Sequence, residues 1–147
     1  MDRREALATL AAAGLAAIAT SPASAAEHEH DHHHHAGPRY QGLVDTAQSC
    51  LATGEACLAH CLDLLGQGDK EMASCAKSVN QMLAMVETLR KLAITESRFL
   101  PRYAALCAEM CEDCEKECRK HENKHAECKA CANSCAACLK ECKATAA

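Results

Sequence analysis

Thiol chemistry dominates this chain, because thirteen of its 147 residues are cysteine. From Cys107 to Cys118 and from Cys128 to Cys142 the cysteines recur in steps of three and four residues. Such steps place side chains on one face of a helix, since each residue turns the helix by roughly 100°. A thiolate is a soft metal ligand, so the spacing predicts helix faces lined with metal-binding sulfur. The thirteen are Cys50, Cys57, Cys61, Cys75, Cys107, Cys111, Cys114, Cys118, Cys128, Cys131, Cys135, Cys138 and Cys142.

The composition favours helices as the elements that carry these thiols. Glycine and proline are few, and the chain has one Phe, two Tyr and no Trp, so Ala, Leu and Cys must fill the interior. The net charge of −4 gives no reason to expect a nucleic-acid partner.

Hydrophobic periodicity and turn residues predict four helices, at about residues 39–65, 69–93, 96–120 and 125–143. Asp69 and Thr95 are the expected N-caps of the second and third helices. Short turns at 66–68 and 121–124 favour antiparallel neighbours. The predicted fold is all-α, an antiparallel up-down four-helix bundle with a thiol-lined core, spanning residues 39–147 as one metal-binding domain.

The thiols of each helix form a narrow stripe. They span about 40° on the first helix, about 60° on the third and about 80° on the fourth. The second helix contributes only Cys75, and its stripe continues with Val79, Met82, Val86 and Leu89. Met82 is interpreted as a core residue, which is the usual role of methionine at helical spacing.

The bundle topology also predicts how the thiols are ordered along the axis. Most of them fall near the turns at 66–68 and 121–124, and four more, Cys50, Cys107, Cys138 and Cys142, lie further in. Leu43, Val86, Leu89 and Leu100 form an expected apolar plug at the far end. The column of sulfur would then open toward the two turns.

Two segments precede the predicted bundle. Residues 1–26 are typical of an export signal, with Arg3-Arg4 before an apolar run and small residues at a cleavage site. The arginine pair favours a twin-arginine signal, and an ordinary secretory signal is the alternative. The apolar run is too short for stable membrane insertion. With an export signal, the expected location is therefore the periplasm or the outer side of the membrane. Residues 27–38 form a His-rich arm, expected to be disordered, which either captures metal or is a solvated linker.

Several chemistries compete for the thiols. The thiols could be small buried hydrophobes or the active pair of a thiol oxidoreductase. They could also form the disulfides of a stapled exported bundle with a structural or partner-binding role, or they could be metal ligands. No nucleophile–base–acid constellation is present, and no cysteine pair stands out, so no enzyme activity is predicted. Neighbours on one helix face are poorly placed to form disulfides with each other.

Among metals, Cu(I) fits better than zinc. It prefers thiolate and accepts low coordination numbers, whereas structural zinc sites take four ligands from pairs held on turns. Bare thiolates in a dry core would be very costly, and one Cu(I) per thiolate neutralises them. This argument predicts on the order of ten or more Cu(I) ions per chain.

With these spacings, the chain resembles the cysteine-rich four-helix-bundle copper storage proteins of bacteria, in the exported branch with twin-arginine signals. The motifs that carry the resemblance are Cys50-x6-Cys57-x3-Cys61, Cys75, Cys107-x3-Cys111-x2-Cys114-x3-Cys118 and Cys128-x2-Cys131-x3-Cys135-x2-Cys138-x3-Cys142. The resemblance implies a homotetramer that stores multiple Cu(I) ions and exchanges them with copper donor and acceptor proteins.

The resemblance also implies that His and Met join the cysteines at the open end. The matching positions are His60 and Met72, and His121 and His125 flank the nearby turn. For each of these residues, a surface or packing role is the alternative.

Overall fold

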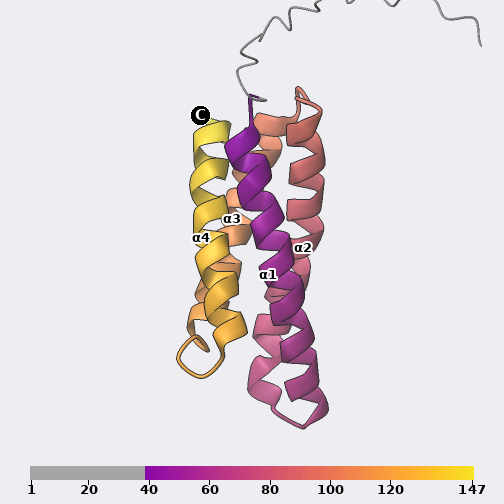
Figure 1. Ribbon diagram of the computed structural model, residues 1–147, viewed down its shortest axis with the longest axis vertical. Coiled ribbons are helices and arrows are strands. Elements are labelled where there is room, and N and C mark those ends of the chain that lie inside the picture. Colours follow the sequence, from indigo (N-terminus) through magenta and orange to yellow (C-terminus); the bar gives the residue numbers. More distant parts are fainter. Residues whose placement is uncertain (1–38) are drawn as a thin grey trace, which may run out of the picture. The chain divides into compact units, whose positions relative to one another are not determined.

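Four helices carry most of residues 39–147, which are the residues that the computed structural model describes. They are α1 (Gln41–Gly66), α2 (Ala73–Ile94), α3 (Leu100–Arg119) and α4 (Ala126–Ala146), and a short 3₁₀ helix, η1 (Lys70–Met72), precedes α2. Each helix packs against two others, so that α1, α2, α3 and α4 close a ring around one core. Figure 1 shows consecutive helices running in opposite directions. The predicted antiparallel up-down bundle is confirmed. The predicted export signal and His-rich arm lie outside the described residues.

A left-handed glycine ends α1. Gly68 has φ 95, and the backbone N–H of Asp69 donates to the carbonyl of Leu64 at 3.0 Å, which closes the helix end. The Asp69 side chain then accepts a hydrogen bond from the N–H of Glu71 at 3.1 Å. Asp69 therefore caps η1, and α2 follows directly.

The third helix starts later than the sequence predicts. Thr95 is the C-cap of α2, and Glu96 takes the left-handed φ of 46 that closes this helix end. The helix α3 begins only at Leu100, with Pro101 in its first turn. Proline lacks the backbone N–H that a helix interior needs, so the first turn is where it fits. A left-handed glutamate is uncommon, so residue type alone does not reveal this turn.

Arg119 fastens the turn between α3 and α4. Its guanidinium donates to Glu122 at 2.7 Å and to the Asn133 side-chain oxygen at 2.9 Å. His125 precedes α4 as its N-cap residue, and its backbone N–H donates to the carbonyl of His121 at 3.0 Å. These contacts hold the ends of both helices at the end of the bundle where α1 turns into α2 (Figure 1).

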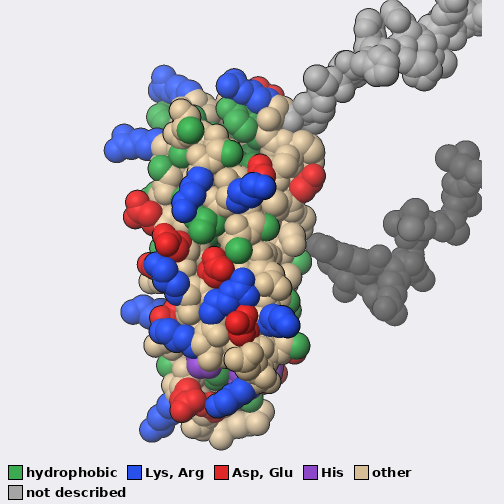
Figure 2. Space-filling view, turned by 90° about the vertical axis from the view of Figure 1, so that its left-hand side faces the viewer, with side chains coloured by type: hydrophobic (Ala, Val, Ile, Leu, Met, Phe, Trp, Pro, Cys, Tyr) green, Lys and Arg blue, Asp and Glu red, His purple; other side chains and the backbone are tan. Residues whose placement is uncertain are grey.

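Charged side chains of both signs cover the face drawn in Figure 2. Pairs such as Lys91–Glu87 at 2.7 Å and Lys116–Glu112 at 3.3 Å are exposed i,i+4 contacts, which add little stability. The core must therefore supply most of it. Within residues 39–147, no helix is long and apolar enough to cross a membrane.

Candidate metal centre

All thirteen cysteines lie in the interior of the bundle. Each is 0% exposed, and each is a free thiol. The predicted thiol-lined core is therefore confirmed. The disulfide-stapled bundle finds no support, since no sulfur of these cysteines is bonded to another.

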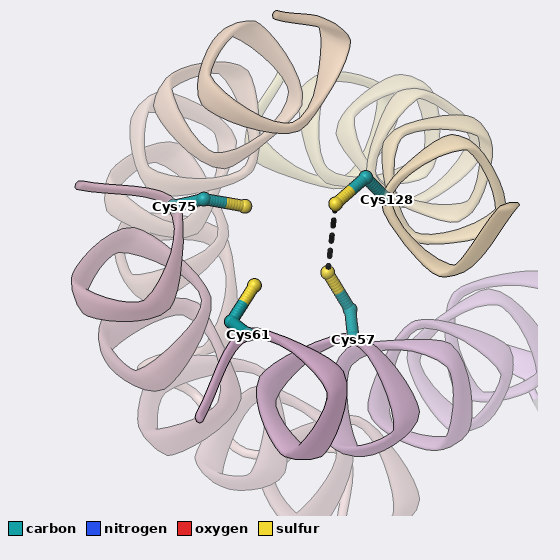
Figure 3. A group of neighbouring side chains, drawn as sticks. All are labelled: Cys57, Cys61, Cys75 and Cys128. Atoms are coloured by element: carbon teal, nitrogen blue, oxygen red, sulfur yellow. Dashed lines mark hydrogen bonds between the residues drawn. The ribbon is translucent and has the colours of Figure 1, made fainter. Parts of the chain in front are cut away.

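The cluster nearest the two turns joins three helices. The sulfur atoms of Cys57 and Cys61 on α1, Cys75 on α2 and Cys128 on α4 all lie within 4.8 Å of one another. Figure 3 shows the four side chains pointing into the space that the helices enclose, with Cys57 and Cys128 in contact at 3.8 Å. The helix α3 joins this level through Cys118, whose sulfur is 3.6 Å from that of Cys75.

Deeper in the core, other sets of cysteines also have sulfur atoms that all lie within 4.8 Å of one another, and these sets share members. Cys131 belongs both to a set with Cys57 and Cys118 and to a set with Cys114 and Cys135. Cys135 in turn lies 3.7 Å from Cys50 across the α1–α4 interface. The sets are thus links of one continuous column. Its members at these levels are Cys57, Cys114, Cys118, Cys131, Cys135 and Cys50.

The column ends at the innermost thiols. Cys50 forms a set with Cys111 and Cys138, and Cys138 lies 4.0 Å from Cys142. Cys107 donates to the backbone carbonyl of Met85 at 3.6 Å. The apolar residues predicted to form the plug are buried. These are Leu43, Val86, Leu89 and Leu100, each at most 1% exposed.

The thiols influence one another's ionisation. Burial raises the pKa of Cys107, and burial together with the charge of Cys75 raises the pKa of Cys128 to about 11. Hydrogen bonds from Cys118, Cys57 and Cys61 instead lower the pKa of Cys75. One sulfur of a cluster is thereby favoured as thiolate while its neighbours hold their protons, so a metal ion that binds several sulfurs must displace protons.

The sulfur spacing fits a metal ion. With metal–sulfur bonds of about 2.3 Å, as in zinc thiolate sites, an ion can join sulfurs up to about 4.6 Å apart. The interhelical pairs at 3.6 to 3.8 Å fall within this reach. Since sets share members, one thiolate can bridge neighbouring ions, which suits a soft ion of low coordination number.

Histidines gather beside the end of the column nearest the two turns, the end that the sequence predicts to be open. Nε2 of His60 on α1 lies 2.9 Å from Nδ1 of His125 and 3.7 Å from a carboxylate oxygen of Glu127. The ring of His121 lies 6.5 Å from that of His125. Histidine side chains, purple in Figure 2, are visible at the surface in the lower part of the bundle. The structure thus joins His60 to His125 rather than to His121. The sequence does not predict that Glu127 lies beside His60, because only the α1–α4 packing brings it there.

Two methionines are buried in the bundle core. Met72, predicted at the open end, is 1% exposed and ends η1, three residues before Cys75. Met82 is 0% exposed, and its sulfur lies 3.3 Å from that of Cys50. From the sequence, Met82 is expected only to pack in the core. Its place on the inward stripe of α2 is the one sign in the sequence that it faces the thiols.

Fold and site together define a helical-bundle protein whose core can hold many soft metal ions. The family model "Copper storage protein" matches residues 36–147. The chain therefore belongs to the copper storage protein family.

Two solved structures resemble the bundle. Copper-free copper storage protein 3 from Bacillus subtilis is 29% identical, with a TM-score of 0.64 over 73% of this chain and 98% of the other. The Cu(I)-bound copper storage protein BsCsp3 is 29% identical, with a TM-score of 0.68 over 74% of this chain and all of the other. Among curated proteins, no match was found.

Proposed function

We propose that this chain stores Cu(I) in its core, binding many ions through cysteine thiolates and supplying them to copper-dependent proteins. The observation that carries the proposal is that all thirteen cysteines are buried, and that twelve of their sulfurs form one continuous column whose sets join all four helices. A relative of the same fold is known in a Cu(I)-bound form, which supports this choice of metal.

Charge balance sets the expected capacity. Every thiolate in the column is shielded from water, so unbalanced negative charge would strongly destabilise the fold. One Cu(I) per thiolate removes that charge, and shared members of the sulfur sets allow bridging. The capacity is therefore on the order of ten or more ions per chain. Three tetrahedral zinc ions would leave a large negative charge.

Storage is favoured over thiol–disulfide catalysis by the uniform burial of the thiols. An oxidoreductase needs an accessible cysteine of low pKa. Cys75 and Cys131 have lowered pKa values because neighbouring thiols hydrogen-bond to them, but both are 0% exposed. The expected role is sequestration, in which the bundle keeps Cu(I) from redox cycling.

The location, assembly and partners of the chain are proposed as well. Export to the periplasm by a twin-arginine signal is supported by Arg3-Arg4 and the segment that follows. A homotetramer agrees with the resemblance to this family and with exposed apolar side chains on and beside α3, such as Phe99 at 60% and Leu106 at 51% exposure. Copper donor and acceptor proteins are the expected partners.

One titration tests the function. Reduced mature chain is titrated anaerobically with Cu(I) against a competing chelator, and the bound ions are counted by native mass measurement, which also gives the oligomeric state. Saturation at ten or more ions per chain is expected, whereas saturation at one to three ions contradicts storage. Circular dichroism of the copper-free chain should show a helical protein, as expected from a relative of the same fold that is known in a copper-free form.

A further inference from the structure

Met82 places a thioether in the sulfur column on α2, which has no cysteine after Cys75. Inward positions of α2 after Cys75 are held by Val79, Met82, Val86 and Leu89, each 0% exposed. Met82 is therefore the second sulfur that this helix sends into the core. Its Sδ is 3.3 Å from the Sγ of Cys50, in the direction in which that thiol donates its proton.

Glycine at position 54 makes room for this methionine. Gly54 lies four residues after Cys50 and three before Cys57, so it occupies the thiol-bearing stripe of α1. A Cβ there would lie 2.7 Å from the Met82 methyl carbon and 2.8 Å from Leu83 Cδ2. A side chain at position 54 would collide with Met82 in its observed position.

The surroundings of Met82 are those of a ligand site. Cys50 belongs to the set with Cys111 and Cys138, and its sulfur also lies 3.7 Å from that of Cys135. All four thiols are fully buried. Each further thiolate at this depth adds negative charge that water cannot screen. A thioether is neutral, so Cu(I) held by one thiolate and one thioether has no net charge, whereas Cu(I) held by two thiolates is an anion.

We infer that Met82 is a Cu(I) ligand, and that it forms with Cys50 a mixed thioether–thiolate site at the inner part of the column. On binding, the Cys50 thiol releases its proton to solvent and its sulfur binds Cu(I). The Met82 sulfur donates a lone pair, and nothing is oxidised. The three rotatable bonds of methionine allow the two sulfurs to open around the ion. This inference rests on the copper storage proposed above.

X-ray absorption at the selenium edge tests it directly. The full mature chain is labelled with selenomethionine, loaded with Cu(I), and compared with M82L and M110L labelled in the same way. Met110 is the control, because it is half-buried on α3 and lines a surface groove with Lys77 and Asp113. Leucine conserves volume in both variants. A selenium–copper contribution should be present in the parent, retained in M110L and reduced or lost in M82L, with one bound ion fewer in M82L.

The outcomes separate this site from storage as a whole. Full copper loading with the same selenium–copper contribution in M82L as in the parent, or with none in either, would overturn the Met82 site and leave storage intact. Failure of the parent to bind copper would overturn both. If M82L does not fold, the M72L/M85L/M110L variant is used, in which Met82 is the only selenomethionine of the bundle. If the selenium in this copper-loaded variant has no copper neighbour, the Met82 site is overturned.

Discussion

The imidazole Nε2 of His60 lies 2.9 Å from Nδ1 of His125, which joins α1 to the N-cap of α4 beside the end of the sulfur column nearest the two turns. Both side chains are half-buried, so they lie between solvent and the fully buried cluster that includes Cys61 and Cys128. A histidine binds Cu(I) less strongly than a thiolate does, and a weaker ligand at this point allows an ion to pass stepwise.

The variant H60A/H125A should therefore slow copper exchange without emptying the core. Loss of a transfer ligand contributing about 1.4 kcal/mol to the rate-limiting barrier slows uptake by about tenfold. Stopped-flow transfer of Cu(I) from a chelator measures the rate, and native mass gives the capacity, which should remain within one or two ions of the parent. The control is K124A in the same turn. Equal rates in all three proteins would mean that the histidine pair only packs.

Cysteines in shared sulfur sets should matter more for capacity than cysteines outside them. Cys131 belongs to two of the sets, whereas Cys107 belongs to none and donates to a backbone carbonyl. We expect C131A to lose about two ions at saturation and C107A at most one, because a bridging thiolate serves more than one ion. Both residues are fully buried, so the unfolding free energy of each copper-free variant should fall by a similar amount, about 1 kcal/mol. Equal copper losses would contradict bridging through Cys131.

Alkaline pH should destabilise the copper-free bundle. Burial raises the pKa of Cys107 and that of Cys128, the latter to about 11, while a thiol in the unfolded chain ionises near 8.5. Above that pH the native state keeps protons that the unfolded state has lost, so the unfolding free energy falls as pH rises, by about 1.4 kcal/mol per pH unit for each such proton. Thiols with lowered pKa, such as Cys75, are ionised in both states there and do not oppose the fall.

Urea unfolding between about pH 8.5 and pH 9.5, where lysine is still almost fully protonated, measures this effect. The copper-loaded protein is the control, because its thiols have already released their protons. A copper-free bundle whose stability is constant over this range would contradict the raised pKa values.

A side chain at position 54 should lower the unfolding free energy of the bundle. An alanine Cβ there would lie 2.7 Å from the Met82 methyl carbon, whereas a Cβ at Gly66, the last residue of α1, would have no such neighbour within 4 Å. Overpacking typically costs about 1–3 kcal/mol, which exceeds the gain of about 1 kcal/mol in helix propensity. In urea unfolding of the copper-free chain we expect G54A to be destabilised and G66A to be neutral or stabilised. A stabilised G54A would show that Met82 and Leu83 move aside freely.

Much of the architecture is predictable because it is encoded locally. Steps of three and four residues between cysteines fix a helix face whatever surrounds it, and so the sequence places Cys107, Cys111, Cys114 and Cys118 on one buried stripe. The turn after α1 is also predictable, since Gly68 is the residue type that a left-handed helix end prefers. The turn after α2 is not, because Glu96 adopts a left-handed φ that its residue type does not favour.

The sequence by itself determined that four helices form and that their thiols face inward, because helical periodicity is a property of neighbours along the chain. Only the tertiary structure decided which sulfurs meet. Cys50 meets Cys135 and Met82, and Gly54 leaves room for the Met82 side chain. These contacts depend on how far each helix is rotated and shifted along the bundle axis. Those two quantities are set by side-chain packing between helices, which spacing within one helix does not specify.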